Sequence, residues 1–330
     1  MNEPLIVIIL INYKNVEDTI ECLKSIQQLE YNNYKVIIVD NHSHDGSVEK
    51  LHELFPQYQL IASAENKGFA GGNNVAIAQA MDNKADFIFL LNNDTIVEKN
   101  ILKELVQAAE KYPKAGIFGS KIFHYDNKEM IDHFGGHWHK EKAEFFSLTE
   151  PFATIKDKKV DYVSGCAFFI KRAVIERIGL LDENFFLIWE ETDYCSRAIK
   201  QGFEIWAIHK AHLWHKISAS FSGGKPHTYY YWWRNRLLWI EKNCPPAEKK
   251  WLYKHVIFPE VIHLIKLRYL KIIPTYLSQL LFWQNKKRDR MLKYLRYKAG
   301  VKGIYDFVFK RFGKGPIWIS KMPKESFFKR

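Results

Sequence analysis

The apolar run at residues 87–91 changes abruptly to three polar side chains, Asn92, Asn93 and Asp94. Five consecutive apolar residues predict a fully buried strand of a parallel sheet. Such sheets place their ligands just beyond the carboxyl ends of the strands, where carboxylate and amide oxygens can hold a divalent cation against a phosphate. The alternative is a turn in which Asp94 or Thr95 caps the helix that follows.

The same order of apolar run, polar loop and helical period occurs three times before this strand. The runs at 5–11, 34–39 and 58–62 are typical of central parallel strands. Short connections of this kind imply right-handed βαβ units, so we predict an α/β fold with a doubly wound, Rossmann-like sheet. Apolar residues at helical spacing predict a helix after each of these runs, the third of them running through Met81. In the first two helices these residues are Ile20, Leu23, Ile26 and Leu29, and then Val48, Leu51, Leu54 and Phe55.

The loops after these strands carry the candidate ligands. The first loop lacks G-x-G-x-x-G, which argues against a dinucleotide such as NAD or FAD. Polar side chains follow the four strands instead, at Asn12, Asp40, Asn66 and Asp94. Asp40 is well placed for a base or a ribose hydroxyl, although residues 40–47 could also form a capped turn.

A glycine-rich loop at residues 68–74 precedes the third helix. Backbone N–H groups exposed at a positive helix end would form an anion site. The alternative is a tight turn in which the glycines allow close packing.

The second half of the chain begins with a strand predicted at 114–125 and an irregular insertion with a hairpin at 126–158. The insertion holds His133, His137 and His139, which could form a zinc site but lack a cysteine or a second paired spacing. Surface histidines near an acceptor groove are the interpretation we favour. A strand follows at 160–170, with Ser164, Gly165 and Cys166 interrupting it.

An acidic segment, Glu190, Glu191 and Asp193, begins the next helix, which ends near 201–202. Carboxylates at a helix start are favoured by the helix dipole alone. The residues before them are apolar and aromatic, however, and an apolar surface raises the pKa of a carboxyl towards that of a general base.

A strand predicted at 203–208 leads to three histidines, His209, His212 and His215. A neutral imidazole can bind Mn²⁺ or Mg²⁺ beside oxygen ligands. Solvated loop histidines are the alternative, and they fit His209 and His212 better than His215.

Charge divides the chain into two parts. The net charge is +12 and the pI is about 9.3, yet residues 225–330 hold 25 Lys/Arg against 6 Asp/Glu, a net +19 that leaves −7 for residues 1–224. With 330 residues the chain can hold one large domain or two moderate ones. A basic second part after an acidic first part suggests that the two parts have different functions.

The basic part is apolar and aromatic between 256 and 283, where Lys266, Arg268 and Lys271 interrupt it. Helices of this composition suit the interface of a bilayer that carries anionic lipid. Core helices with a solvated basic face are the alternative. We expect residues 218–224 to form a flexible loop.

Three further features bear on location. We predict no secretory signal, since the start has Glu3 and no basic segment, and no transmembrane helix, since no stretch approaches 18 uncharged apolar residues. Scattered cysteines fit a reducing cytosol better than a disulfide framework or a zinc motif. The cysteines are Cys22, Cys166, Cys195 and Cys244.

An ordered set of motifs resembles the inverting glycosyltransferases of family 2, and is most similar to their rhamnosyltransferase-like branch with the GT-A fold. The resemblance covers roughly residues 4–240, including the aromatic-Arg-Asn segment at 229–236. The motifs are Asn12-Tyr13, Val39-Asp40-Asn41-x-Ser43-x-Asp45-Gly46, Asn66-x-Gly68-Phe69-Ala70-x-Gly72-x-Asn74, Asn92-Asn93-Asp94 and the acidic element at 190–193.

The resemblance implies a role for each matching position. Asp94 and His215 would bind Mg²⁺ or Mn²⁺, and Glu191 would be the base, with Glu190 and Asp193 as the other catalytic carboxylates. Gly165, Cys166 and Trp189 would contact the acceptor. The residues implied in donor binding are Asn12, Tyr13, Asp40, Asn41, Asp45, Asn66, Gly68, Phe69, Gly72, Asn74, Asn92 and Asn93.

The function expected from this set is sugar transfer from a dTDP- or UDP-sugar to a glycan or lipid-linked glycan in cell-surface polysaccharide assembly. Residues 1–224 would form the GT-A domain, with a donor-binding half at 1–115 and an acceptor half at 116–224, and the helical region 225–330 would hold the cytoplasmic enzyme on an anionic membrane surface. We predict no nucleic-acid partner. The alternative is a non-catalytic nucleotide-sugar-binding or membrane-associated scaffold protein.

Overall fold

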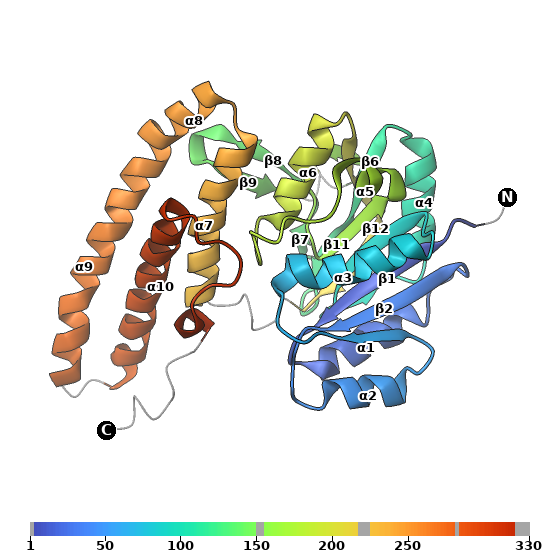
Figure 1. Cartoon of the computed structure of the whole chain (residues 1–330), viewed down its shortest axis with the longest axis horizontal. Coiled ribbons are helices and arrows are strands. Elements are labelled where there is room, and N and C mark those ends of the chain that lie inside the picture. The colour runs from blue at the N-terminus through green and yellow to red at the C-terminus, as the bar shows by residue number, and fades with distance from the viewer. Residues whose placement is uncertain (1–2, 150–154, 217–224, 281–283, 321–330) are drawn as a thin grey trace. The chain divides into compact units, whose positions relative to one another are not determined.

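The computed structural model describes residues 3–149, 155–216, 225–280 and 284–320 (Figure 1). The chain forms two compact units. The sheet unit comprises Met1–Trp138, Phe145–Phe186 and Glu190–Ile217, and the helical unit comprises His139–Glu144, Leu187–Trp189 and Ser218–Arg330. The expected loop at 218–224 lies outside the described residues. No helix in the described part of the chain combines the length and the apolar character needed to cross a bilayer.

The sheet unit is built on a mixed sheet in the order β10-β12-β6-β11-β4-β1-β2-β3, with β5 on β12 and β7 on β6. A separate two-stranded sheet pairs β8 with β9. The strands are β1 (Ile6–Asn12), β2 (Tyr34–Asp40), β3 (Gln59–Ala62), β4 (Phe87–Asn92), β5 (Thr95–Val97), β6 (Ala115–His124), β7 (Ile131–His133), β8 (Gly136–His139), β9 (Glu144–Ser147), β10 (Lys158–Val160), β11 (Ala167–Lys171) and β12 (Glu204–His215).

The first four strands of the chain are parallel neighbours, as the repeated pattern predicts. The sheet then departs from a purely parallel one, because β11 runs antiparallel between β4 and β6. The helices of the unit are α1 (Val16–Ile26), α2 (Ser47–Leu54), α3 (Gly68–Asp82), α4 (Ile101–Lys111), α5 (Arg172–Ile178) and α6 (Glu190–Lys200).

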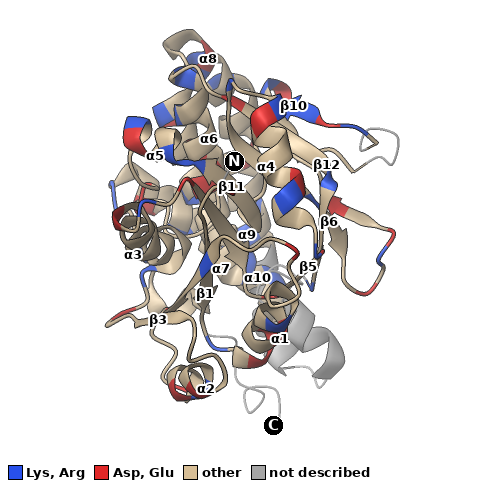
Figure 2. Cartoon of the chain, turned by 90° about the vertical axis from the view of Figure 1, so that its right-hand side faces the viewer, with Lys and Arg blue, Asp and Glu red and all other residues tan. Residues whose placement is uncertain are grey.

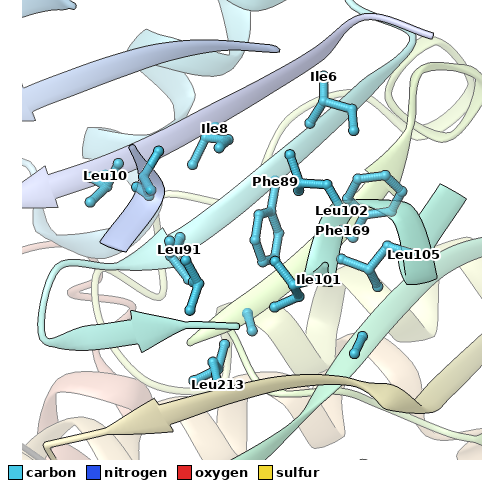
Figure 3. Close-up of a cluster of buried hydrophobic side chains, with 14 of the residues drawn as sticks. Ile6, Ile8, Leu10, Phe89, Leu91, Ile101, Leu102, Leu105, Phe169 and Leu213 are labelled. Atoms are coloured by element: carbon cyan, nitrogen blue, oxygen red, sulfur yellow. The ribbon is translucent and has the colours of Figure 1, made fainter. Parts of the chain in front are cut away.

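Alternating side chains of the central strands fill two cores, one on each face of the sheet. Ile6, Ile8 and Leu10 of β1 face the core that includes α1 and α4, and Figure 3 shows them beside Phe89 of β4. Val7 and Ile9 face the opposite core, with α3, α5 and α6. Burial on both faces accounts for the absence of charge from β1, whereas α2 carries both signs (Figure 2).

Several predicted boundaries are wrong in ways that matter for the site. Asp94 and Thr95 do not cap a helix, because β5 follows β4 and pairs with β12. His209 and His212 are not in a loop, because β12 continues to His215. The first helix ends at Ile26, so Leu29 lies beyond it and packs against the core from the following turn.

The helical unit consists of α7 (Pro226–Asn243), α8 (Pro246–Leu252), a π-helical turn (Tyr253–Ile257), α9 (Phe258–Leu280) and α10 (Gln284–Val308), followed by a short 3₁₀ turn (Ile317–Ser320). Helix α10 packs against α7 and α9. The Tyr230 hydroxyl donates to Asp306 Oδ2 at 2.8 Å, and the buried Arg234 donates to the Gly313 carbonyl at 2.6 Å. The arginine of the aromatic segment therefore holds the unit together from inside.

Candidate functional site

Asp40 is held in place at the carboxyl edge of the sheet, where β1 and β2 end side by side with Asn12 opposite it. Asn12 Nδ2 donates to Asp40 Oδ2 at 2.7 Å, and the Ser43 N–H donates to Asp40 Oδ1 at 2.9 Å. The Thr19 hydroxyl donates to Asn12 Oδ1 at 2.7 Å, which fixes the amide orientation. Asn12 and Asp40 are almost fully buried. The hydrogen bonds from Asn12 and Ser43 therefore hold the Asp40 carboxylate in one orientation at the edge of the sheet.

The loops beside Asp40 have unusual backbone conformations. Lys14 and Asn15 both have positive φ, at 54° and 114°, and Tyr13 is 45 % exposed next to them. A ring held out on such a turn is available for stacking on a base. Asp45 Oδ1 accepts from the Ser47 N–H at 3.2 Å, so that carboxylate forms a local turn just before α2.

The glycine-rich segment at 68–74 forms the first two turns of α3 and not a loop before it. Its leading N–H groups already have acceptors: Gly68 N donates to Asn66 Oδ1 at 2.8 Å, and Phe69 N donates to the Phe186 carbonyl at 2.7 Å. Asn41 completes the arrangement by donating to the Gly68 carbonyl at 2.9 Å. These N–H groups are therefore not an open anion site, which corrects the expectation of a backbone cradle.

Close packing explains the glycines. Gly68 has φ +70°, and a Cβ there would overlap the Phe186 carbonyl oxygen. A Cβ at Gly72 would lie 2.7 Å from the Ile11 side chain. Asn74 has a bridging role, since its amide donates to the Leu181 carbonyl at 2.9 Å and accepts from the Leu181 N–H at 3.0 Å.

Asp94 and His215 meet beyond the ends of β4 and β12, where β5 pairs Thr95 with His215. His215 Nε2 lies 3.2 Å from Asp94 Oδ1, and His215 Nδ1 lies 3.3 Å from Asp132 Oδ2. Asn93 is turned towards Thr19, to whose hydroxyl it donates at 2.8 Å, and the Asn92 carbonyl accepts from the Thr95 hydroxyl.

This pair fits a divalent cation held partly by a diphosphate. Mg²⁺ commonly takes one or two carboxylates and completes its shell with substrate phosphates and water. No group of three or more His, Cys, Asp or Glu side chains is arranged as a complete metal cage in the described residues. A carboxylate on the far nitrogen of a metal-binding imidazole is the usual partner that fixes the ring, and Asp132 has that position.

The protonation of His215 depends on the carboxylates beside it. Burial disfavours the imidazolium, but Cys166 and the hydrogen bonds with Asp132 and Asp94 raise the pKa of His215. Burial acts in the opposite direction on Asp132, and the hydrogen bond with His215 nevertheless lowers the pKa of that carboxyl. A cation at Asp94 would take the place of the imidazolium proton.

The acidic element opens α6 after a strained turn. Phe186, Ile188 and Trp189 have φ of 62°, 69° and 78°. Within the helical unit, Asn235 Nδ2 holds this turn by donating to the Leu187 and Ile188 carbonyls at 2.8 and 2.7 Å. Such strain persists only where surrounding contacts enforce it, and it is concentrated at functional sites.

The three carboxylates have different surroundings. Glu190 is 4 % exposed, and burial together with the charge of Glu191 raises the pKa of its carboxyl well above the ordinary value. Asp193 is fully buried and accepts from Arg197 Nε at 2.9 Å, while the same guanidinium donates to the Ile178 and Leu180 carbonyls. Asp193 thus anchors α6 to the preceding loop.

Glu191 lies beside two other predicted positions. An added Cβ at Gly165 would be 3.2 Å from the Phe69 ring and 3.7 Å from Glu191 Cβ, so the three residues line one spot. Cys166 is buried behind them, and its carbonyl accepts from the Asn92 N–H at 2.9 Å. Trp189 is 5 % exposed and packs against Trp239 of α7, so its ring is a core residue of the helical unit and not a surface for an acceptor.

The model of the family "Glycosyl transferase family 2" matches residues 6–179, which hold β1 to α5 and include Asp40 and Asp94. The chain belongs to this family.

Similar proteins include two rhamnosyltransferases. The N-acetylglucosaminyl-diphospho-decaprenol L-rhamnosyltransferase of Mycobacterium tuberculosis is 24 % identical over 62 % of this chain and 78 % of its own length. The dTDP-rhamnosyl transferase RfbF of Shigella flexneri is 25 % identical over 67 % and 75 %. The low-salt glycan biosynthesis hexosyltransferase Agl10 of Haloferax volcanii is 28 % identical over 60 % of this chain, which spans 62 % of that relative.

Solved structures share the GT-A fold with this family 2 chain. The mannosyltransferase PcManGT of Pyrobaculum calidifontis, in complex with GDP-Man and Mn²⁺, has a TM-score of 0.56 at 13 % identity, covering 94 % of this chain and 89 % of its own. TarS of S. aureus has a TM-score of 0.52 at 13 % identity, covering 94 % of both chains. The predicted family, GT-A fold and helical C-terminal region are confirmed.

Other histidines singled out in the sequence lie away from the Asp94–His215 pair in their contacts. His209 Nδ1 lies 2.8 Å from Asp157 Oδ1, and His212 Nε2 lies 2.7 Å from the His209 carbonyl. His133 is half-buried with its Nε2 buried, and burial lowers the pKa of the ring to about 4. His137 pairs with Asp161 at 3.3 Å. Among the residues that the structure describes, the three histidines of the insertion are not grouped as a zinc site.

Sequence reasoning missed the residues that position the site. Four residues each hold a predicted residue: Asp132, Ser43, Thr19 and Arg197. Asp132 acts between distant strands, Arg197 across one turn of α6, and Thr19 from α1 back to the end of β1. Ser43 stood inside a quoted motif and could have been found. Asp132 could not, because it lies 83 positions from His215 in an insertion without regular pattern.

Proposed function

We propose that this glycosyltransferase is a metal-dependent, inverting enzyme that uses a dTDP- or UDP-sugar and a lipid-linked glycan acceptor in cell-surface polysaccharide assembly. The observation that carries the proposal is the 3.2 Å approach of His215 Nε2 to Asp94 Oδ1 at the sheet edge that bears Asp40. A divalent cation bound by this pair would neutralise the departing nucleoside diphosphate.

Asp40 and Tyr13 would bind the nucleoside. The two oxygens of Asp40 are oriented by Asn12 and by the Ser43 N–H, so they can accept further hydrogen bonds from a base or ribose without reorganising. The exposed Tyr13 ring would stack on the base. The relatives named for dTDP-rhamnose and for a decaprenol-linked substrate support dTDP-rhamnose as the first donor to test and a lipid-linked acceptor.

Glu191 would take the proton from the acceptor hydroxyl as that oxygen attacks the anomeric carbon from the face opposite the nucleotide. The new C–O bond forms as the bond to the diphosphate breaks, and this single displacement inverts the carbon. The raised pKa of Glu190 favours its protonated form. Glu191, which lies beside Gly165 and Phe69, is the carboxylate we assign to general-base work. Asp193 would position the helix through Arg197.

The helical unit would hold the enzyme on an anionic membrane. Along α9, apolar side chains at helical spacing are exposed in one stripe: Phe258, Ile262, Ile265 and Tyr269. The unit belongs to the part of the chain with 25 Lys/Arg against 6 Asp/Glu. An apolar stripe in a basic unit is suited to the headgroup region of anionic lipid.

Release of nucleoside diphosphate from a donor panel by purified protein, with and without Mn²⁺, tests the catalytic proposal. Turnover that requires the metal, together with an inverted anomeric centre by NMR, is expected. Donor binding without release would favour the scaffold alternative. Release that is insensitive to EDTA would refute the metal assignment.

Liposome co-sedimentation tests the membrane proposal. Ile262→Glu with Tyr269→Glu should lower binding to anionic vesicles, whereas Leu54→Glu, at an exposed apolar residue of α2, should leave it unchanged. Equal binding of both variants would refute the role of the stripe. Truncation after Asn243 is a poorer test, because α7 packs against α10 and would lose its buried partner.

A further inference from the structure

Thr19 of α1 contacts both the proposed nucleoside site and the proposed metal site. Its hydroxyl donates to Asn12 Oδ1 at 2.7 Å and accepts from Asn93 Nδ2 at 2.8 Å. Asn12 in turn donates to Asp40 Oδ2 at 2.7 Å, and Asn93 directly precedes Asp94. All of these residues belong to the sheet unit, and Thr19 is fully buried there. This shared hydroxyl therefore joins the carboxylate proposed for the nucleoside to the turn that carries a proposed metal ligand.

The direction of each hydrogen bond in this series follows from the carboxylate at its end. The Asp40 carboxylate can only accept, so Asn12 turns its Nδ2 towards it and leaves its Oδ1 facing Thr19. A hydroxyl has one proton to donate, and Thr19 gives that proton to Asn12. The same hydroxyl can then only accept from Asn93, which must present its amide nitrogen. The orientation of the Asn93 amide is thus set from the nucleoside side.

Helix α1 also holds the backbone around the metal turn. Cys22 Sγ lies 3.7 Å from the Asn92 carbonyl oxygen. The Lys216 ammonium pairs with Asp18 at 2.6 Å, and the Lys216 N–H donates to the Asp94 carbonyl at 2.9 Å. These contacts fix the backbone of the turn against α1. The shared hydroxyl is the contact that continues from this turn to the nucleoside carboxylate.

We propose that Thr19 is a positioning residue for both sites, because its hydroxyl orients Asp40 for the nucleoside and the turn at 92–94 for the metal. The inference rests on the proposed function for the identity of the two ligands. It adds that both affinities depend on one buried residue. Without the hydroxyl, the buried Asn12 oxygen and the Asn93 N–H would lose this partner, and both amides would turn to seek another.

Separate titrations with a nucleoside and with Mn²⁺ test the proposal, because neither probe carries the diphosphate that would otherwise link the two sites. Thymidine or uridine is titrated by NMR in EDTA, and Mn²⁺ is titrated by EPR without nucleotide. Thr19→Val keeps the side-chain shape and removes the hydroxyl, so it should weaken each probe at least about fivefold. Thr19→Ser keeps the hydroxyl and should stay within about twofold of wild type for both.

Three variants serve as comparisons. Ser120→Ala removes a buried hydroxyl of β6 that has no hydrogen-bond partner among the described residues, so both affinities should be unchanged. Tyr13→Ala should weaken the nucleoside and not Mn²⁺, whereas Asp132→Asn should weaken Mn²⁺ and not the nucleoside. Loss of both probes by a Thr19→Val chain that still unfolds cooperatively on heating would separate the shared role from either single site and from a loss of stability.

A second measurement leaves Thr19 in place. Asn93→Asp replaces the donated N–H by a carboxylate oxygen, which competes with Asn12 for the one proton of the shared hydroxyl. Asn93→Ala leaves that proton with Asn12. The change to aspartate on the metal side should therefore weaken the uncharged nucleoside at least about threefold more than the change to alanine.

The outcomes distinguish this inference from the proposed function. Thr19→Val binding both probes like wild type, losing one of them alone, or being matched by Thr19→Ser would overturn the role of the hydroxyl. Equal nucleoside affinity in the two Asn93 variants would overturn it as well, even if Thr19→Val did not fold. Failure of the wild-type protein to bind a nucleoside or Mn²⁺ would instead refute the proposed function.

Discussion

Replacement of Asp132 should weaken the metal without removing either proposed ligand. Its Oδ2 lies 3.3 Å from His215 Nδ1, while the other ring nitrogen faces Asp94. With Asp132 as acceptor, the ring keeps its proton on Nδ1 and presents a lone pair at Nε2 to the cation. The contact also makes the imidazole a stronger ligand through the nearby negative charge.

The magnitude follows from what each substitution leaves behind. Loss of a carboxylate behind a metal-binding histidine costs roughly 10-fold to 100-fold in metal affinity, which is about 1.4 to 2.7 kcal/mol. Asp132→Asn keeps an oxygen that can accept from Nδ1–H and loses only the charge, so we expect about 10-fold. Asp132→Ala removes the acceptor and should approach about 100-fold.

The assay is a Mn²⁺ titration of the purified chain in the presence of nucleoside diphosphate, with turnover measured at saturating Mn²⁺. Turnover at saturation should fall much less than affinity, because the proposed ligands remain. Asp126→Asn, at an exposed residue of the same insertion, is the matched control. Unchanged Mn²⁺ affinity in a folded Asp132→Ala chain would refute the reasoning.

Three further predictions concern the acidic element and the first turn of α3. Glu191→Gln should lower transfer by roughly 10²-fold or more while donor binding is retained, because an amide cannot accept the proton; full activity would move the base elsewhere, with Asp193 tested next. Glu190→Gln should stabilise the chain at pH 7 and have little effect below about pH 4. Because the pKa of Glu190 is raised in the folded state, the unfolding free energy of the wild-type chain falls as pH rises above the unfolded pKa of about 4.3. Unfolding curves of wild type and Glu190→Gln at pH 7 and below pH 4 measure this difference. Gly68→Ala should cost about 1–3 kcal/mol more in unfolding free energy than Gly46→Ala, since both have positive φ but only Gly68 meets a backbone oxygen; equal losses would contradict the packing argument.

Local patterns were enough to predict the parallel half of the sheet. The apolar runs of β1, β2 and β4 are buried on both faces, and such burial produces the continuous apolar run by which a strand is recognised in a sequence. The run at 58–62 forms β3 at the edge of the sheet, where its side chains are exposed or half-buried. The polar residues after these strands, Asn12, Asp40 and Asp94, do gather at one edge, because neighbouring parallel strands end together.

Contacts between distant segments account for what the sequence did not reveal. Helix α3 begins at Gly68 because the Phe186 carbonyl, supplied from far along the chain, accepts its leading N–H groups. Glycine has a low helix propensity, so local reasoning placed a loop there. The strand β5 exists only by pairing with β12, and Asp132 reaches His215 only through the fold.

The most direct test of the account compares nucleoside diphosphate release by wild-type protein and by Asp94→Ala, each with Mn²⁺ and with EDTA. Asp126→Ala serves as the control for loss of a surface carboxylate. The account predicts release by wild type only with the metal, and at least a roughly 10²-fold loss in Asp94→Ala that Mn²⁺ does not restore. Full release by Asp94→Ala, with sensitivity to EDTA retained, would contradict the assignment of the metal to the Asp94–His215 pair.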